Sequence, residues 1–555
     1  MMERTGDVST DTYLARQHYK PSAPAAARSR TSTAILLLTA AVLLGLRLPS
    51  LAQPMGADQS LYAYVGERIL AGERPYVDAW DQKPPAIHYT YALLRAAWPA
   101  DGAVAAADAL AAAGIAALLF LIGRELTSHS VGAGAALVYL LLSNPAFFRL
   151  GGVRVRGQAE IFIALAVTAA AFLLIRSRPL PASLSEAGGR DAWRYAGAGL
   201  LLGAAFTFKY NAGVYGAAAA AGVLGAGALT FRRAGPFAAG YAAFPLAFLL
   251  IFTDALGTVY DATVLYNVRY SGETYSGPLH FLTYLLTFPI QHARVDALWT
   301  LGGAGCAVLL VAGVRDRARL IPVIWVAAAC LSVAINGSRG LPQYFVQAGP
   351  GLALAAAWGG ALAAGAVRER FPPMAARAAL TIGMLVVAVA VARVNQFSKL
   401  AEQTLFDAQA LAGRMTRETY LARYVDGQKY TALGAAQVGR LMQAHSAPDS
   451  PVYLFGFTPA AYLHADRVSA SRFFWSRPVI AGFNEGRPGY GVAGVRAELE
   501  RARPAVVALQ VDDWAPDVTD SAEFFLTTPV LAEWLQSEYR QMPGPDGFDV
   551  WIRRE

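Results

Sequence analysis

The chain contains a series of apolar runs, each about 20 residues long, separated by short polar segments. A run of about this length is what an α-helix needs to cross the hydrocarbon core of a bilayer. The pattern therefore predicts an α-helical polytopic membrane protein with about eleven transmembrane helices. The runs lie near residues 33–51, 103–123, 130–148, 159–175, 195–208, 211–230, 235–254, 297–314, 320–335, 341–365 and 376–394.

Some of these segments admit two interpretations. Residues 195–230 form either two crossings or one long broken helix, and residues 279–290 form a re-entrant or an interfacial helix. The run 33–51 is either a retained anchor or a signal peptide, because Ser50-Leu51-Ala52 resembles a cleavage site. We favour the anchor, since the run is long enough to span the bilayer. Residues 1–32 are polar and predict a disordered cytoplasmic tail.

The composition supports a membrane protein and argues against other classes. Hydrophobic residues make up 55% of the 555 positions and charged residues only 15%, whereas a soluble domain carries about 25% charge. The net charge of +8 comes from short Arg clusters between apolar runs, so we predict no nucleic-acid partner. Cys306 and Cys330 lie inside apolar runs, and His280 and His292 lack a third ligand at readable spacing. We therefore predict no disulfide, no metal site and no cofactor.

The basic residues between the runs predict an orientation. With the N-terminus inside, most Arg clusters fall inside, as the positive-inside rule requires. The outer loops are then 52–102, 149–158, 255–296 and 336–340. Two of them break the rule, because they carry basic residues outside. Such residues are expected where an anionic partner, for example a lipid phosphate, binds. They are Arg149, Arg154 and Arg156 in one loop and Arg269 and Arg294 in the other.

The character of the chain changes after Val394. Residues 395–555 are charged and mixed, with helix-like stretches and strand-like runs in alternation. This alternation predicts a small α/β domain, which an odd number of crossings places outside the cell. The predicted helices lie near 398–425, 430–445, 490–502 and 521–540, and the predicted strands near 452–456, 505–509 and 548–552. The sequence thus predicts three parts. They are a cytoplasmic tail (1–32), a transmembrane domain (33–394) whose first outer loop is 52–102, and this outer domain (395–555).

The first outer loop carries two polar residues that suit catalysis. Asp58 opens a predicted helix, whose N-terminal partial positive charge keeps an acid ionised. It is therefore either a simple N-cap or a base. Lys83 precedes Pro84-Pro85, which favour an extended backbone at the lysine and start the next helix. Lys83 is either an exposed loop lysine or a cation that binds phosphate.

Other polar residues lie at the predicted outer ends of the spans. Glu160 enters an apolar run, which is costly unless the acid is partnered. It either acts on a substrate or pairs with Arg154 or Arg156. Lys209 either meets a phosphate or snorkels to the interface, and Arg269 is a plausible second phosphate ligand. These alternatives stay open on the sequence alone.

Taken in order over roughly residues 33–370, these elements resemble the polyprenyl-phosphate-sugar glycosyltransferases of the GT-C type. That family includes protein mannosyltransferases, aminoarabinose transferases and Rgt-type transferases. The resemblance rests on five elements in sequence order. They are Asp58 before a helix containing Tyr62, Lys83-Pro84-Pro85, Glu160, Lys209, and Gln343-Tyr344-Phe345 before a late span.

The resemblance implies roles for these residues. Asp58 is the expected general base and Glu160 the second acidic group, and Lys83 is expected to contact the lipid phosphate. The remaining expected donor contacts are Arg154, Arg156, Arg269 and Lys209, and the cavity residues are Tyr62, Gln343 and Tyr344. Two departures matter. Gln59 stands where many members have a second acid, so Asp58 acts alone, and Gln343 replaces His, which removes a proton relay at that point.

The implied activity is transfer of a sugar from a polyprenyl-monophosphate donor to an acceptor hydroxyl, with inversion, at the outer face of a bacterial cytoplasmic (inner) membrane. The expected partners are that donor, membrane lipids, and a lipid, glycan or protein acceptor. Two other functions stay open. One is a lipid-linked sugar transporter or flippase, although no mid-span ionisable residues or repeated halves support it. The other is a non-catalytic cell-envelope assembly protein on the same scaffold.

Overall fold

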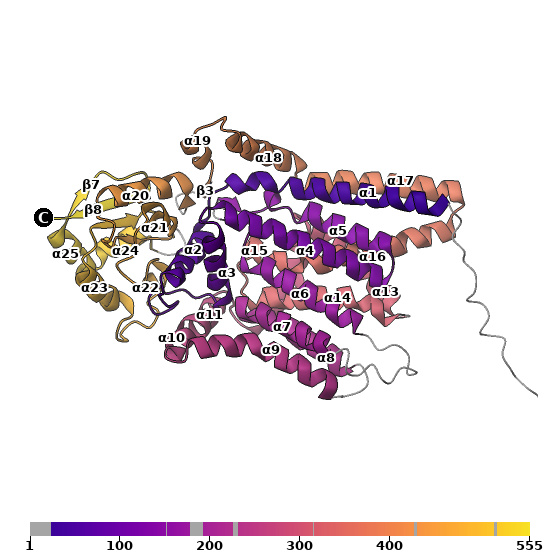
Figure 1. The fold of residues 1–555 in the computed structure, drawn as a ribbon, viewed down its shortest axis with the longest axis horizontal. Helices are drawn as coiled ribbons and strands as arrows, with labels where there is room; N and C mark the ends of the chain where they lie inside the picture. Colours follow the sequence, from indigo (N-terminus) through magenta and orange to yellow (C-terminus); the bar gives the residue numbers. More distant parts are fainter. Residues whose placement is uncertain are drawn as a thin grey trace, which may run out of the picture.

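The computed structural model describes residues 24–150, 152–177, 192–225, 231–314, 316–426, 430–514 and 519–554. Most of the predicted N-terminal tail, 1–32, lies outside these residues. Figure 1 shows two parts, a long helical bundle and a smaller C-terminal part that contains strands. Helices α2 (Ala57–Leu70) and α3 (Ala86–Ala97) lie between the two parts. The segment predicted as the first outer loop therefore joins the bundle to the C-terminal part.

Eight segments among the described residues are long and apolar enough to cross a membrane. The chain is thus a multi-pass membrane protein, as predicted. The segments include short turns such as η1 (Leu48–Ala52) and η2 (Pro145–Phe147) at their ends. Their helices are α1 (Pro24–Gly45), α4 (Gly102–Leu126), α5 (His129–Leu142), α6 (Ala159–Arg176), α9 (Phe231–Ile251), α14 (Leu320–Ile335), α16 (Gly349–Arg370) and α17 (Pro373–Val394).

The other three predicted crossings coincide with shorter helices. They are α7 (Ala192–Phe208), α8 (Gly213–Gly225) and α13 (Ala297–Gly313). The ambiguous stretch 195–230 contains α7 and α8 with the short turn Tyr210–Ala212 between them. The predicted re-entrant or interfacial helix is α12 (Pro278–Ala293), which is bent by 116° from α13; together the two would make a ninth crossing.

Small residues let helices of the bundle pack closely. On α13, a side-chain carbon at Gly305 would overlap the carbonyl oxygen of Ala355 on α16. Gly359 faces Gly305 across the same contact, and a carbon added there would meet the Gly305 backbone. Where lipid surrounds the helices, such close backbone contact is a main source of attraction between them. These glycines therefore set the distance between α13 and α16.

The C-terminal part contains a four-stranded sheet in the order β5-β6-β8-β7. Strands β5 and β6 are parallel, and β8 pairs antiparallel with both β6 and β7. The three predicted strands are confirmed as β5 (Tyr453–Phe455), β6 (Val506–Gln510) and β8 (Phe548–Arg553). Strand β7 (Tyr539–Met542) replaces the end of the predicted helix 521–540. The remaining helices here are α18 (Phe397–Leu411), α19 (Arg417–Leu421), α20 (Ala432–Ala444), α21 (Ala460–Ala465), α22 (Arg477–Ile480), α23 (Gly491–Ala502), α24 (Ser521–Thr527) and α25 (Pro529–Glu538).

Aromatic side chains join the first loop to the C-terminal part. The Tyr64 ring on α2 lies 4.5 Å from the Phe474 ring, and the indole N–H of Trp475 donates a hydrogen bond of 3.1 Å to the Trp80 carbonyl oxygen. Trp80, fully buried, also packs edge-on against Tyr266. Because these rings belong to one continuous buried core, the loop and the C-terminal part form one packed unit.

The α13–α16 contact can be tested with a matched pair of substitutions. Gly305→Ala should destabilise the protein by about 1–3 kcal/mol, because the added methyl group forces two backbones apart. Gly303→Ala, two residues away on the same helix, meets nothing within 4 Å and should leave stability unchanged or slightly raised. Thermal unfolding of the purified protein in detergent measures both. Equal melting temperatures for the two variants would contradict the close contact.

Candidate active site

The backbone turn before Asp58 is held in place by its own side chains. Gly56 is the extended N-cap of α2, and its N–H donates to Gln59 Oε1 at 2.8 Å. The amide nitrogen of Gln59 donates in turn to the Arg156 carbonyl oxygen at 2.6 Å. A side-chain carbon at Gly56 would overlap Val153, so only glycine fits. Gln59, which stands where many members of the resembled family have a second acid, therefore fixes the first turn of α2, which carries Asp58.

Arg156 supports the same turn from the second outer loop. Its buried guanidinium donates to Gln53 Oε1 at 3.0 Å and to the carbonyl oxygens of Gln53 and Pro54 at 2.7 Å and 3.0 Å. No carboxylate forms an ion pair with it within the described ranges. A buried charge that donates to backbone carbonyls holds those carbonyls firmly. Arg156 thus ties residues 53 and 54 to the loop that precedes α6.

Arg154 forms a buried ion pair with a distant part of the chain. Its Nη2 lies 2.6 Å from Asp407 Oδ2 on α18, and both side chains are almost fully buried. The hydroxyls of Tyr420 and Tyr424 donate to Asp407 Oδ1 at 2.8 Å and 2.9 Å. This network fastens the short hairpin of β1 (Arg149–Leu150) and β2 (Val153–Arg154) to α18 and α19.

Asp58 and Lys83 have accessible, unpaired side chains. Both are half-buried, and neither side chain forms a hydrogen bond or ion pair with a residue that the structure describes. Burial raises the pKa of Asp58; the Lys83 and Lys209 charges offset this in part, and those of Asp81 and Glu160 add to it. Burial disfavours the Lys83 charge, but the Asp58 and Asp81 carboxylates outweigh it and raise the pKa of Lys83. These residues therefore form one electrostatically coupled cluster.

The loop that carries Lys83 is fixed by Tyr76. The Tyr76 hydroxyl donates to the Lys83 carbonyl oxygen at 2.7 Å. Tyr76 itself has φ of 70°, which is unusual for a bulky residue and marks a tight turn held by its surroundings. Its buried ring packs edge-on against His88 and Phe252. Pro85 then caps α3, as the Pro pair predicted.

Glu160 pairs with Lys209, and not with either arginine. Glu160 Oε1 and Lys209 Nζ are 2.5 Å apart, and both side chains are buried. The expected partners, Arg154 and Arg156, are engaged elsewhere, so that part of the prediction is wrong. Lys209 does not snorkel, because its ammonium group also lies 4.6 Å from the centre of the Tyr344 ring. The pair joins α6 to the break between α7 and α8.

The expected cavity residues lie in buried positions around this cluster. Tyr62 on α2 packs edge-on against the rings of Tyr91 and His88, at 5.4 Å and 6.0 Å. Gln343 and Tyr344 lie on the short helix α15 (Pro342–Phe345). The side-chain oxygen of Gln343 is buried and has no hydrogen-bond partner among the described residues. It is therefore a free acceptor at the end of α15.

Arg269 lies at the rim. Its side chain is 53% exposed and forms an ion pair of 3.6 Å with Glu273. Arg269 lies on α11 (Tyr266–Gly272), and Glu273 is the residue that follows this helix. Its guanidinium also donates to the Ala481 carbonyl oxygen at 3.1 Å. Arg339, which sequence reasoning missed, stacks on the Tyr270 ring at 3.7 Å. Tyr270 therefore has Arg269 beside it in the chain and Arg339 against its ring. Tyr270 is also one of the groups that influence the pKa of Lys83.

Sequence reasoning also missed a buried acid and histidine. Asp81 Oδ2 lies 3.2 Å from His88 Nε2, and both side chains are almost fully buried. Asp81 is one of the charges that act on Asp58 and Lys83. A signal was present, because Asp81 lies two residues before Lys83 in the same polar segment. No group of three or more metal-ligating residues occurs within the part of the chain that the structure describes, and the absence of a metal stays a prediction.

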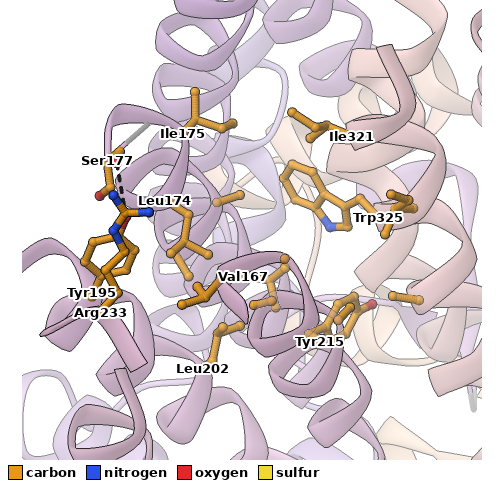
Figure 2. A pocket seen from close by; sticks show the side chains of 18 residues that line it. Val167, Leu174, Ile175, Ser177, Tyr195, Leu202, Tyr215, Arg233, Ile321 and Trp325 are labelled. Atoms are coloured by element: carbon orange, nitrogen blue, oxygen red, sulfur yellow. Dashed lines mark hydrogen bonds between the residues drawn. The ribbon is translucent and has the colours of Figure 1, made fainter. Parts of the chain in front are cut away.

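An apolar cavity of about 350 Å³ lies between α6, α7, α8 and α14. Figure 2 shows Val167, Leu202, Tyr215 and Trp325 around it, with Arg233 at one side. Along α6, Val167 is two turns from Glu160, or about 10 Å at the rise of an α-helix. The Tyr215 hydroxyl donates to Gln347 at 3.0 Å. The cavity thus lies in the apolar part of the bundle and runs along α6 from Val167 toward Ser177, away from Glu160.

No protein-family model and no curated protein sequence matches this chain. Solved structures do match it. ArnT from Cupriavidus metallidurans bound to undecaprenyl phosphate is 16% identical, with a TM-score of 0.58 over 94% of this chain and 98% of ArnT. The archaeal oligosaccharyltransferase AglB from Archaeoglobus fulgidus, in complex with an inhibitory peptide and a dolichol-phosphate, is 12% identical, with a TM-score of 0.50 over 94% of this chain and 75% of AglB. The chain has the GT-C fold of these proteins, as predicted.

The Glu160–Lys209 pair predicts a pattern of stabilities. Either Glu160→Gln or Lys209→Met should cost about 3–5 kcal/mol, because each leaves a buried charge without its partner. The double variant should cost less than the two single variants together, since it removes both charges. Unfolding of the purified proteins in detergent, followed by heat or denaturant, measures the three values. Additive costs would contradict a direct ion pair.

Proposed function

We propose that this protein is a membrane glycosyltransferase that moves a sugar from a polyprenyl-monophosphate donor to an acceptor hydroxyl. The observation that carries the proposal is the pair of accessible, unpaired side chains of Asp58 and Lys83 within one buried charged cluster. The surrounding charged side chains are mostly committed to one another. A base and a cation that are held ready but bind nothing in the protein suit a substrate that supplies both a proton and a phosphate.

The chemistry needs only these two groups at its centre. The acceptor oxygen attacks the anomeric carbon while the bond from that carbon to the phosphate oxygen breaks, and the departing oxygen keeps the bonding electrons. Asp58 takes the proton from the attacking hydroxyl as a general base. Lys83 stabilises the negative charge that develops on the phosphate. Attack opposite the leaving group inverts the anomeric carbon.

The other proposed site residues divide by how firmly they are engaged. Arg269, exposed at the rim, can turn toward a phosphate as a second cation. Arg154 and Arg156 are held in protein contacts, and their proposed contribution is to position the turn before Asp58. Glu160 and Lys209 neutralise each other and shape the floor of the site. Gln343 offers its free acceptor oxygen to a substrate hydroxyl, and Tyr62 and Tyr344 are the other proposed cavity residues.

A lipid-linked donor suits a bundle that contains an apolar cavity. A polyprenyl tail needs an apolar environment, and the cavity between α6, α8 and α14 lies within the spans. The matched ArnT structure holds undecaprenyl phosphate and the matched AglB structure a dolichol-phosphate, so the same fold accommodates such lipids. The distribution of Arg residues supports an extracytoplasmic position for this end of the bundle and for the C-terminal part. We propose the cytoplasmic membrane of a bacterium as the location.

The base assignment predicts a large loss of activity in Asp58→Asn. The substitution removes the proton acceptor but keeps the size of the side chain, so transfer should fall by at least about a hundredfold. The measurement is transfer by the purified protein from a radiolabelled polyprenyl-phosphate sugar, with protein amount and melting temperature checked in parallel. Asp78→Asn, an exposed acid on the same loop, is the matched control and should keep its activity. Undiminished transfer by the Asp58 variant would refute the base.

The pH dependence of transfer predicts a second result. Burial raises the pKa of Asp58 above its usual value of 3.8. As the pH falls through this raised pKa, Asp58 becomes protonated and can no longer act as a base. The acidic limb of kcat/KM should therefore lie above pH 3.8. The Asp81 carboxylate contributes to this increase. Asp81→Asn should therefore move the limb to lower pH, and Asp78→Asn should not move it. A limb that stays in place or moves upward in the Asp81 variant would contradict the coupling.

A further inference from the structure

A second charged cavity lies away from the candidate active site, where several spans end. It has a volume of about 400 Å³ and is lined by residues of η2, α18 and the segments beside them. Three cations and one acid line it. They are Arg149, Lys399 and Arg423, with Glu402. The proposed transfer reaction uses none of these side chains.

The helix that forms one wall lies across the ends of three membrane segments. Helix α18 begins three residues after α17 ends. It packs against η1 and η2, which are the last turns of the segments Ala34–Ala52 and His129–Phe147. Figure 1 shows α18 just beyond the ends of α1 and α17. The cavity therefore lies at the depth where the apolar segments stop and lipid headgroups begin.

The neighbouring helices leave room for lipids beside the cavity. In the apolar stretch of the first segment, Ala34–Ala52, only 11% is buried inside the protein, and in that of α17 only 6% is buried. Apolar side chains such as Leu385 and Val389 on α17 are 62% and 68% exposed. In a bilayer, acyl chains cover such surfaces. A lipid that lies along α17 then brings its headgroup to the mouth of the cavity.

The cations in the cavity are only partly neutralised. Arg423 forms an ion pair of 2.7 Å with Glu402. Arg149 donates to the neutral side chain of Gln403 at 2.6 Å and to the Gly152 carbonyl oxygen at 3.3 Å. Neither Arg149 nor Lys399 pairs with a carboxylate of the described residues. The cavity thus carries an excess of positive charge.

The positive charge of Arg149 is disfavoured by its surroundings. Burial lowers the pKa of Arg149, and the positive charge of Arg423 lowers it further. An anion between the two guanidinium groups would relieve this repulsion and accept hydrogen bonds from both. A phosphate group is the anion that membrane lipids present at this depth.

We propose that the cavity formed by Arg149, Lys399 and Arg423 binds the phosphate group of an anionic membrane lipid. This site is separate from the donor site, and its occupant is a bilayer phospholipid whose acyl chains lie against α1 and α17. The bound headgroup fills the space between η2 and α18. It thereby braces α18, which carries Asp407, against the ends of the membrane segments.

Native mass spectrometry of the full-length protein tests the proposal. The purified protein is equilibrated with detergent micelles that contain equal amounts of phosphatidylglycerol and phosphatidylcholine. The wild-type protein should retain phosphatidylglycerol in preference to the zwitterionic lipid. Lys399→Gln and Arg423→Gln should each reduce that retention about fivefold, since each removes one cation near the headgroup. Both side chains reach the surface, so the fold should survive, and melting temperatures check this.

A matched control and a competitor complete the test. Arg440→Gln removes an exposed cation that is also ion-paired, with Glu418 at 3.4 Å, and should leave retention unchanged. Inorganic phosphate at millimolar concentration separates the two sources of the anion. If inorganic phosphate does not displace phosphatidylglycerol, the cavity is a lipid site. If it does displace phosphatidylglycerol, the cavity takes the phosphate group from either source. Equal retention of the two lipids by the wild type, or equal phosphatidylglycerol retention by the wild type and both cavity variants, would overturn the proposal.

Discussion

The arrangement of the candidate site depends on the hydrogen bonds that Arg156 makes to the backbone of residues 53 and 54. These bonds join the end of the first membrane segment to the loop before α6, and Gln59 closes the link by donating to the Arg156 carbonyl oxygen. Asp58 occupies the next helical turn and needs no partner of its own to be fixed. The Arg156 guanidinium thus fixes the backbone that leads into the turn of Asp58 and makes no ion pair with the Asp58 carboxylate. The same loop is fastened to α18 through Arg154 and Asp407, so the position of Asp58 is set jointly by three distant parts of the chain.

The balance of charge in the cluster suits the proposed reaction. Three acids and two lysines influence one another there, and they are Asp58, Asp81, Glu160, Lys83 and Lys209. A donor with one phosphodiester charge adds a further negative charge and raises the pKa of Asp58, which makes it a stronger base when the donor is present. During transfer the phosphate gains negative charge as the sugar leaves, while Asp58 loses its charge by accepting the proton. The total charge of the site therefore changes little along the reaction, and the buried surroundings need not reorganise.

The sequence predicted those features that are encoded within one short segment. The apolar runs predicted the spans, because length and composition alone determine them, and Asp58 and Lys83 were readable because one polar loop contains both. Contacts between distant segments were not readable. Nothing near Glu160 indicates that Lys209 is its partner, and nothing near Arg154 points to Asp407. Strand β7 was missed for a similar reason, because its sequence, Tyr-Arg-Gln-Met, continues a helical pattern and becomes a strand only by pairing with β8. The Asp81–His88 contact was within reach, since both residues flank Lys83-Pro84-Pro85.

The packing of the first loop against the C-terminal part constrains how an acceptor reaches Asp58. Trp80 is buried between Tyr266 and Trp475, and moving the C-terminal part away would expose these rings to water at a cost that their large apolar area sets. The packed interface between the first loop and the C-terminal part therefore does not admit an acceptor. The face toward α11 is different, because its side chains are charged and exposed, with Arg269 and Arg339 on either side of Glu273. Side chains on an exposed rim can exchange their ion pairs for a substrate at little cost. We propose that an acceptor approaches the cluster from this rim, where it would meet Tyr270 and the cations Arg269 and Arg339 first.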